Sequence, residues 1–245
     1  MIEIRELKKR FESHSVLDGV DLNLNKGETL TVMGISGCGK TTLLKLVIGL
    51  LSADSGSIKV DGEEVTGLTE KEYNNTIRRR MTMVFQQGAL WDSKTVGENI
   101  ELALNIREGI SEPERRDMVM ESLERVSMEG TENMYPEELS GGMIKRAAIA
   151  RAIAARPDYL LYDEPTTGLD PVLSRRISEL IIKLDEELQT SSLVISHDIS
   201  SIPHFSDRVA MMHGGKIVLT CEADKIWDQK NEVFKDFLHG TLENV

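Results

Sequence analysis

The sequence of 245 residues has little cysteine and no long apolar run. Its two cysteines, Cys38 and Cys221, stand in no metal-ligand spacing, so we expect two reduced thiols and neither a disulfide nor a zinc site. The apolar runs are shorter than the roughly 18 to 20 residues that cross a bilayer, and the sequence does not open on a signal-peptide core. We therefore expect a soluble protein that stays in the cytoplasm.

Positive charge is also scarce. Acidic residues number 41 against 29 basic ones, which gives a formal net charge of −12 and argues against broad binding to nucleic acid. The cluster Arg78-Arg79-Arg80 is too short to reverse this, and we interpret it as a solvated face or a local ion-pair site. The sequence contains no internal repeat and no low-complexity tract, so the chain should fold throughout.

Two kinds of strand are predicted from the hydrophobic pattern. Apolar and polar residues alternate at residues 2–4 and 20–24, and a tight turn at Asp61-Gly62 joins residues 57–60 to residues 63–65, which is typical of a small antiparallel sheet. Continuous apolar runs are instead typical of strands buried on both faces of a parallel sheet. Four such runs occur, at residues 29–33, 81–85, 159–162 and 193–195.

Each continuous run ends at a polar or glycine-rich segment. In chain order these are the glycine-rich loop at residues 34–41, Gln86, Asp163-Glu164 and His197. Since ligands of open α/β sheets gather at the carboxyl ends of the strands, we expect all four segments to meet at one edge.

The hydrophobic period changes to about 3.6 between Thr95 and Pro157, which predicts helices at residues 95–107, 112–126 and 143–155. We therefore divide the single domain of residues 1–245 into three parts. Residues 1–89 and 158–220 form the core with the antiparallel strands, residues 90–157 a helical lobe, and residues 221–245 a short helical tail.

The loop after residues 29–33 has the spacing G-x-x-x-x-G-K-[ST] of a P-loop. Its glycines let backbone N–H groups turn inward around a phosphate, and the helix that follows adds its positive N-terminal end. Lys40 can reach the β- and γ-phosphates of a nucleotide, and the Thr41 hydroxyl can ligate Mg²⁺. The predicted nucleotide-binding residues of this loop are Gly34, Ile35, Ser36, Gly37, Cys38, Gly39, Lys40, Thr41 and Thr42.

Two adjacent carboxylates close the apolar run at residues 159–162. Asp163 can hold Mg²⁺ together with Gln86 from a neighbouring strand end. Because side chains alternate faces along a strand, Glu164 can serve a different atom, the attacking water. The alternative is that Glu164 is only a solvated loop acid.

The segment Leu139-Ser140-Gly141-Gly142-Met143 opens the last helix of the lobe. It offers the Ser140 hydroxyl, the backbone amides of Gly141 and Gly142, and a helix N-terminus, all of which suit a γ-phosphate.

Together, in this order, these motifs make the chain resemble the ABC-type ATPases over nearly all 245 residues. The resemblance implies an α/β fold: a P-loop NTPase (RecA-like) core with a mainly parallel sheet, a small antiparallel β subdomain and an inserted ABC helical subdomain. It implies ATP hydrolysis with ATP and Mg²⁺ bound. Its catalytic residues would be Lys40, Glu164 as the general base, and His197. His197 would contact the γ-phosphate and help to fix the attacking water; the alternative for His197 is a structural role.

The resemblance also implies a homodimer. In ABC ATPases the signature that corresponds to Ser140, Gly141 and Gly142 completes the site of the opposite subunit, and Asp170 lies in a loop that meets the partner. Met143 stands where the family most often has glutamine, and a thioether cannot replace an amide donor. Phe11 resembles the aromatic residue that stacks on adenine; the alternative is a hairpin core residue.

Two function classes of ABC ATPase fit these motifs: the motor of a membrane transporter, or a soluble protein that works on ribosomes or DNA. The second class usually joins two cassettes in one chain or inserts a long coiled coil, and this sequence does neither. A transporter motor is therefore favoured. The helical lobe and the segment after Gln86 would receive the membrane partner, with Trp91 either on that surface or in the core of the lobe.

Three local segments are similar to the ATPases of Mla-type phospholipid transporters. They are Gly-Ala-Leu-Trp-Asp-Ser after Gln87, the signature with Met143 followed by Lys145-Arg146-Ala147, and residues 233–240. This similarity implies a peripheral subunit on the cytoplasmic face of the inner membrane. Its partners would be an integral permease, a periplasmic or membrane-anchored MCE lipid-binding protein and, in some systems, a STAS-domain subunit, with no nucleic acid. The alternative is an importer motor for amino acids or another small solute.

Overall fold

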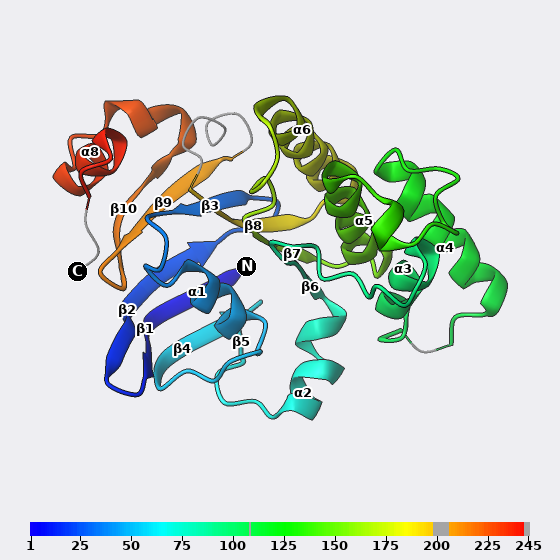
Figure 1. The fold of residues 1–245 in the computed structure, drawn as a ribbon. Helices are drawn as coiled ribbons and strands as arrows, with labels where there is room; N and C mark the ends of the chain where they lie inside the picture. The colour runs from blue at the N-terminus through cyan, green and yellow to red at the C-terminus, as the bar shows by residue number, and fades with distance from the viewer. Residues whose placement is uncertain (108, 198–205, 243–245) are drawn as a thin grey trace.

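The computed structural model describes residues 1–107, 109–197 and 206–242, and two sheets organise it (Figure 1). The larger sheet has the strand order β10-β9-β3-β8-β7-β6, and all neighbours are parallel except β10 and β9. Its strands are β3 (Thr29–Met33), β6 (Met81–Val84), β7 (Tyr159–Asp163), β8 (Ser191–Ser196), β9 (Arg208–His213) and β10 (Lys216–Glu222). The four predicted apolar runs are confirmed as neighbouring strands, and β3, β7 and β8 are buried along their whole lengths.

The smaller sheet is antiparallel, as the alternating pattern predicts, with the order β2-β1-β4-β5. Its strands are β1 (Ile2–Phe11), β2 (His14–Leu24), β4 (Ser55–Val60) and β5 (Glu63–Glu64). Helix α1 (Lys40–Val47) presents Leu43, Leu44 and Val47 to a core that also contains apolar residues of both sheets. The two sheets and α1 therefore share one hydrophobic core.

A second core lies on the other face of the parallel sheet. It joins that face to the buried side chains of three helices that gather beside each other in Figure 1, and to those of α6. The helices are α3 (Val96–Leu104), α4 (Glu112–Arg125), α5 (Gly141–Ala154) and α6 (Pro171–Leu188). The other helices that the structure describes are α2 (Glu70–Asn75), α8 (Glu232–His239) and 3₁₀ turns at Ile77–Arg79, Pro136–Glu138 and Ala223–Asp228. Phe234 of α8 and Ile226 also belong to this second core.

Side-chain caps set where these helices begin. Thr95 and Ser111 form capping boxes with Glu98 and Glu114. Helix α4 therefore starts where the sequence predicts, whereas α3 starts one residue later than predicted, after its cap, and ends three residues earlier. Helix α5 starts at Gly141, two residues before the predicted start, because the Ser140 hydroxyl accepts a hydrogen bond from the Met143 amide. Glycine has a low helix propensity, and the periodicity alone therefore missed this first turn.

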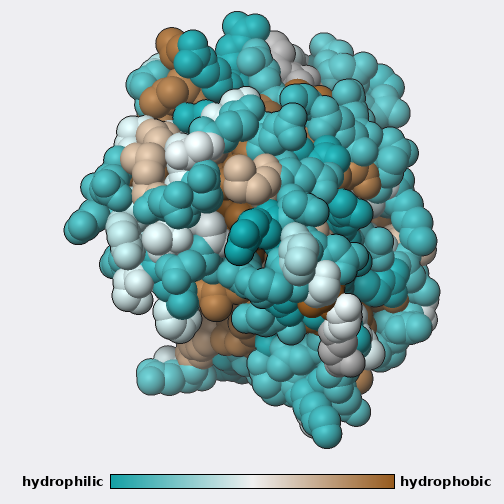
Figure 2. Space-filling model, turned by 90° about the vertical axis from the view of Figure 1, so that its right-hand side faces the viewer, coloured by the Kyte–Doolittle hydropathy of each residue, from teal (hydrophilic) through white to brown (hydrophobic). Residues whose placement is uncertain are grey.

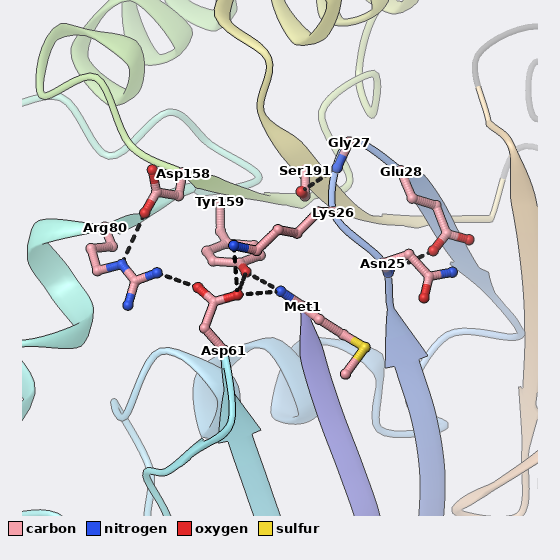
Figure 3. A network of polar contacts seen from close by, with 10 residues as sticks. All are labelled: Met1, Asn25, Lys26, Gly27, Glu28, Asp61, Arg80, Asp158, Tyr159 and Ser191. Carbon is pink, nitrogen blue, oxygen red and sulfur yellow. Dashed lines mark hydrogen bonds and ion pairs between the residues drawn. The ribbon is translucent and has the colours of Figure 1, made fainter.

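A polar network links the two sheets at the edge where the parallel strands begin (Figure 3). Its centre is Asp61, in the turn between β4 and β5, which binds the Met1 ammonium (2.6 Å), Lys26 (3.2 Å), Arg80 and the Tyr159 hydroxyl (2.8 Å). Burial alone would raise the pKa of Asp61, but hydrogen bonds from the amino terminus, Tyr159 and Lys26 hold that pKa below its usual range.

The predicted ion-pair role of the arginine cluster is confirmed at two positions. Arg80 binds Asp61 and also donates to Asp158 at 2.9 Å, and Arg78 pairs with Glu70. The two cysteines are free, as predicted.

The surface over the helical side is mainly hydrophilic, with apolar residues in small separate patches (Figure 2). Among the described residues, no helix has the length and apolar character that a membrane span requires.

Candidate functional site

The carboxyl edge of the parallel sheet brings the predicted polar segments together. The loop after β3 leads into α1, Gln86 follows β6 by two residues, Asp163 ends β7, and His197 follows β8. Because β6, β7, β8 and β3 are parallel neighbours, these ends lie side by side. The hydrogen bonds among the side chains, described below, confirm that they form one cluster.

Two glycines of the P-loop are required by close packing. A Cβ on Gly34 would lie 2.4 Å from the Met212 carbonyl oxygen, and one on Gly39 would lie 2.9 Å from the Val16 carbonyl oxygen. Both glycines also have positive φ, 153° and 108°. Any other residue at these positions would force the loop away from its neighbouring strands.

Lys40 lies over the loop that precedes it. Its ammonium is buried and donates to the carbonyl oxygens of Gly34 and Ile35, each at 2.8 Å. The positive charge is therefore held at the mouth of the loop, where a phosphate would lie. Burial raises the pKa of the nearby Cys38 thiol, which keeps it in the protonated, unreactive form at neutral pH.

A hydroxyl and a carboxylate meet beside this loop. The Thr41 hydroxyl donates to Asp163 Oδ1 at 2.9 Å. Asp163 is buried, and that burial raises its pKa, an effect that the hydrogen bond from Thr41 partly offsets. A bound cation would remove the cost of burying this charge, so a hydroxyl and a carboxylate at this spacing suit Mg²⁺ completed by phosphate and water.

Glu164 is the most connected carboxylate of the cluster. Its Oε2 accepts hydrogen bonds from the Thr167 hydroxyl (2.8 Å) and Gln86 Nε2 (3.3 Å), and it lies 3.1 Å from His197 Nδ1. Only 16% of its side chain is exposed, and its φ of 47° is in the left-handed region. These contacts exclude the alternative of a freely solvated loop acid. A strained backbone in a polar cluster is typical of a functional site.

A cavity of about 430 Å³ opens in front of the P-loop. Glu164, Gln86, Thr42 and Phe11 are among the residues that line it. Phe11 is 42% exposed, so the alternative of a hairpin core residue is wrong. Two further lining residues, His14 and Val16, were not predicted; they lie on β2 just after the hairpin that carries Phe11.

The signature residues do not line this cavity. Ser140 caps α5 by accepting from the Met143 amide at 3.4 Å, and Gly142 is buried, with Leu173 3.7 Å from where a Cβ would lie. The Met143 side chain packs half-buried on the helical core. Asp170 caps α6 by accepting from the amides of Val172 (2.9 Å) and Leu173 (3.0 Å). Within one chain, the signature residues Ser140, Gly141 and Gly142 therefore lie outside the cavity in front of the P-loop.

The segment after Gln86 borders a groove of about 820 Å³. Leu90 and Asp92 line it together with Ile144 of α5, and Thr41 and Asp163 line it from the edge of the parallel sheet. Trp91 lies between Leu90 and Asp92 in the chain and is 60% exposed, so its alternative assignment to the core of the lobe is wrong. Its backbone is nevertheless fixed, because the buried Asn99 accepts from the Trp91 amide (2.7 Å) and donates to its carbonyl (3.1 Å).

Besides His14 and Val16, sequence reasoning missed the roles of three residues around this edge. Thr167 donates to Glu164, and two cations of α5, Lys145 and Arg151, bind carbonyls of the segment that starts at Gln86. Lys145 carried a signal, since Ala148 and Ile149, three and four positions later on the helix, are apolar and place its charge on the buried face. Burial lowers the pKa of Lys145, whereas the charges of Glu164 and Asp163 act to raise it.

The comparisons with known proteins agree with this geometry. A family model described as "ABC transporter" matches residues 17–167. The chain is 41% identical over 227 residues to a methionine import ATP-binding protein of Rhizobium etli, covering 93% of this chain and 62% of that protein. It is 37% identical over 242 residues to the ATP-binding protein of an intermembrane phospholipid transport system in Haemophilus influenzae, covering 98% and 90%.

A solved structure is also similar. It is a dimeric ATP-binding cassette, MJ0796, in a post-hydrolysis state bound to ADP and Pi. It has a TM-score of 0.84 and 32% sequence identity, and the alignment covers 91% of this chain and 99% of that one.

Proposed function

This chain belongs to the ABC transporter family, and from that premise we propose that it binds and hydrolyses ATP as the motor subunit of a membrane transporter. The observation that carries the proposal is the polar cluster at the carboxyl edge of the sheet. Thr41 donates to Asp163 there, Gln86 donates to Glu164, and Lys40, Thr41 and Glu164 line one cavity together with the exposed ring of Phe11.

The nucleotide would bind along this cavity. Phe11 stacks on adenine, the P-loop amides of residues 34–42 hold the phosphates, and Lys40 offsets their charge. Thr41, Asp163 and the amide oxygen of Gln86 would hold Mg²⁺, which neutralises charge on the β- and γ-phosphates. The Gln86 oxygen is the atom left for this role, because its Nε2 donates to Glu164.

Glu164 and His197 act on the attacking water. The Glu164 carboxylate takes a proton from the water as the water oxygen bonds to the γ-phosphorus and the bond to the β–γ bridging oxygen breaks, giving ADP and phosphate. His197 Nδ1 lies 3.1 Å from Glu164 Oε2, which leaves Nε2 for the water or the γ-phosphate. General-base activation contributes about 10²- to 10⁴-fold to such a rate.

The active form we propose is a homodimer. Ser140, Gly141 and Gly142 do not line the cavity of their own chain, so they would complete the site of a second copy, with Asp170 at the same contact. The dimeric form of the similar cassette supports this arrangement. Met143 offers no side-chain amide at this contact.

We assign the parts of the chain as follows. Residues 1–89 and 158–220 hold the nucleotide, residues 90–157 receive an integral permease, and residues 221–245 form the tail. The exposed side chain of Trp91 supports this docking role for the helical lobe. The chain would then lie on the cytoplasmic face of the membrane. The net charge of −12 opposes the alternative of a soluble ABC protein acting on nucleic acid or ribosomes.

Phospholipid is the proposed cargo, moved with an MCE-type lipid-binding protein and in some systems a STAS-domain subunit. Three segments resemble Mla-type ATPases, and the phospholipid-transport relative aligns over 90% of its own length. The second candidate is an amino-acid importer, because the methionine-import relative is 41% identical.

The cargo test is reconstitution of the chain with its permease in liposomes that contain labelled phospholipid. ATP-dependent transfer of the label to the lipid-binding protein, or from it, is expected. ATP-dependent movement of an amino acid without lipid transfer would replace phospholipid by the second candidate, and an inactive complex with a wild-type ATPase would point to a missing subunit.

A further inference from the structure

Helix α5 binds one backbone segment at two points. Lys145 Nζ donates to the carbonyl oxygen of Gln86. Six residues further along the helix, Arg151 donates to the carbonyls of Gly88 (2.7 Å) and Ala89 (2.6 Å). Three of the four carbonyl oxygens of residues 86–89 are therefore bound by cations of the signature helix.

The backbone of this segment needs such support. Gly88 and Ala89 both have positive φ, 76° and 49°, and a turn closes where the Gly88 amide donates to the Phe85 carbonyl at 2.9 Å. Left-handed backbone is unfavourable for alanine. The segment also packs tightly, since a Cβ on Gly88 would lie 2.9 Å from Ile144 Cγ2 on α5. Residues 86–89 are thus hydrogen-bonded to α5 and packed against it.

Lys145 is connected to the proposed catalytic carboxylate, Glu164, through Gln86. Lys145 is 6% exposed, and its charge is attracted by those of Glu164 and Asp163. Gln86, whose carbonyl it binds, donates through its side-chain Nε2 to Glu164 Oε2 at 3.3 Å. A buried ammonium is costly unless it is paired, so its place beside this carbonyl and these carboxylates is specific.

We propose that Lys145 is a positioning residue. By binding the Gln86 carbonyl it fixes Gln86 relative to α5, and Gln86 in turn sets the geometry of Glu164 for hydrolysis. The inference rests on the proposed ATPase function. Arg151 holds the other end of the segment, next to Leu90 and Trp91, so one helix orients both the catalytic end and the partner-facing end.

The test compares steady-state hydrolysis by purified variants. Lys145→Met keeps the length of the side chain but cannot donate, and Lys145→Arg keeps the charge and the donors. Lys183→Met is the matched control, because Lys183 is an exposed lysine of α6 that pairs only loosely with Glu187 at 3.7 Å. Gln86→Ala and the double variant with Lys145→Met complete a cycle.

We expect Lys145→Met to lower kcat by about tenfold or more while KM for ATP changes by less than about threefold, because the P-loop is untouched. Lys145→Arg should restore most of kcat. The double variant should be no slower than Gln86→Ala, because Lys145 acts through Gln86. Thermal stability of Lys145→Met should stay close to that of the wild type.

The other possible results distinguish a failure of the proposed ATPase function from a failure of the proposed role of Lys145. If the wild type and Lys183→Met do not hydrolyse ATP, the proposed function falls and the role of Lys145 falls with it. If they do and Lys145→Met is equally active, only the positioning role is overturned. The positioning role is also overturned if Lys145→Met worsens kcat, KM and thermal stability together and Lys145→Arg does not restore them. The same holds if the fold-losses in kcat of Lys145→Met and Gln86→Ala multiply in the double variant.

Discussion

Replacing Glu164 by glutamine separates nucleotide binding from cleavage. The carboxylate accepts from Thr167 at 2.8 Å and from Gln86 at 3.3 Å, and an amide oxygen of the same size can accept both bonds. The fold should therefore survive. The amide cannot take a proton from water, so the variant loses general-base catalysis, a factor of about 10²–10⁴ that corresponds to roughly 3–5 kcal/mol in activation free energy.

The assay for Glu164→Gln has two readouts. Phosphate release should fall by the factor given above, and gel filtration with ATP and Mg²⁺ should show a stable dimer that the wild type does not accumulate. Glu179→Gln, at an exposed residue of α6 that pairs with Arg175, is the control and should behave as the wild type. Phosphate release by Glu164→Gln within about threefold of the wild type would refute the assignment of the base, and monomers alone would refute the dimer.

Two further predictions concern stability and assembly. Asp61→Asn removes the charge that Arg80 and Tyr159 bind and should cost about 2–4 kcal/mol, or roughly 5–12 °C in Tm. Because the folded-state pKa of Asp61 is lowered, the extra stability of the wild type over Asp61→Asn should be complete above about pH 4 and should shrink as the pH falls further. Urea unfolding midpoints of both proteins, measured across pH, would check this. A difference in stability that stays constant with pH would contradict it. Trp91→Ala should leave hydrolysis by the isolated chain intact, because Asn99 still holds the backbone of residue 91. Its affinity for the permease should fall more than about thirtyfold, which co-purification of the complex would reveal. A joint loss of Tm and activity in the isolated variant would instead mean that Trp91 supports the fold.

The parallel strands and their functional ends were predictable because their signals are local. A buried strand is a short apolar run, and the P-loop and the carboxylates of Asp163 and Glu164 follow such runs directly. Fold class and the cluster at the sheet edge follow from these runs and from the rule that ligands gather at the carboxyl ends.

The remaining features depend on contacts between distant residues. Lys145 meets Gln86 across 59 positions of sequence, and Asp61 meets Tyr159 across 98, and neither pairing has a local pattern. The sequence could not decide whether Trp91 and Phe11 are exposed, for a similar reason. An aromatic residue on a lobe or hairpin can pack in a core or lie on a binding surface, and only the packing of distant residues decides between them.

The most direct test of the ATPase assignment is phosphate release by the purified wild type with ATP and Mg²⁺, measured beside Lys40→Ala. The wild type should hydrolyse ATP. Lys40→Ala should fold but release no phosphate above background and bind ATP more weakly, because the ammonium held at the Gly34 and Ile35 carbonyls is the charge that faces the phosphates. Near-normal turnover by Lys40→Ala, or none by the wild type, would contradict the account.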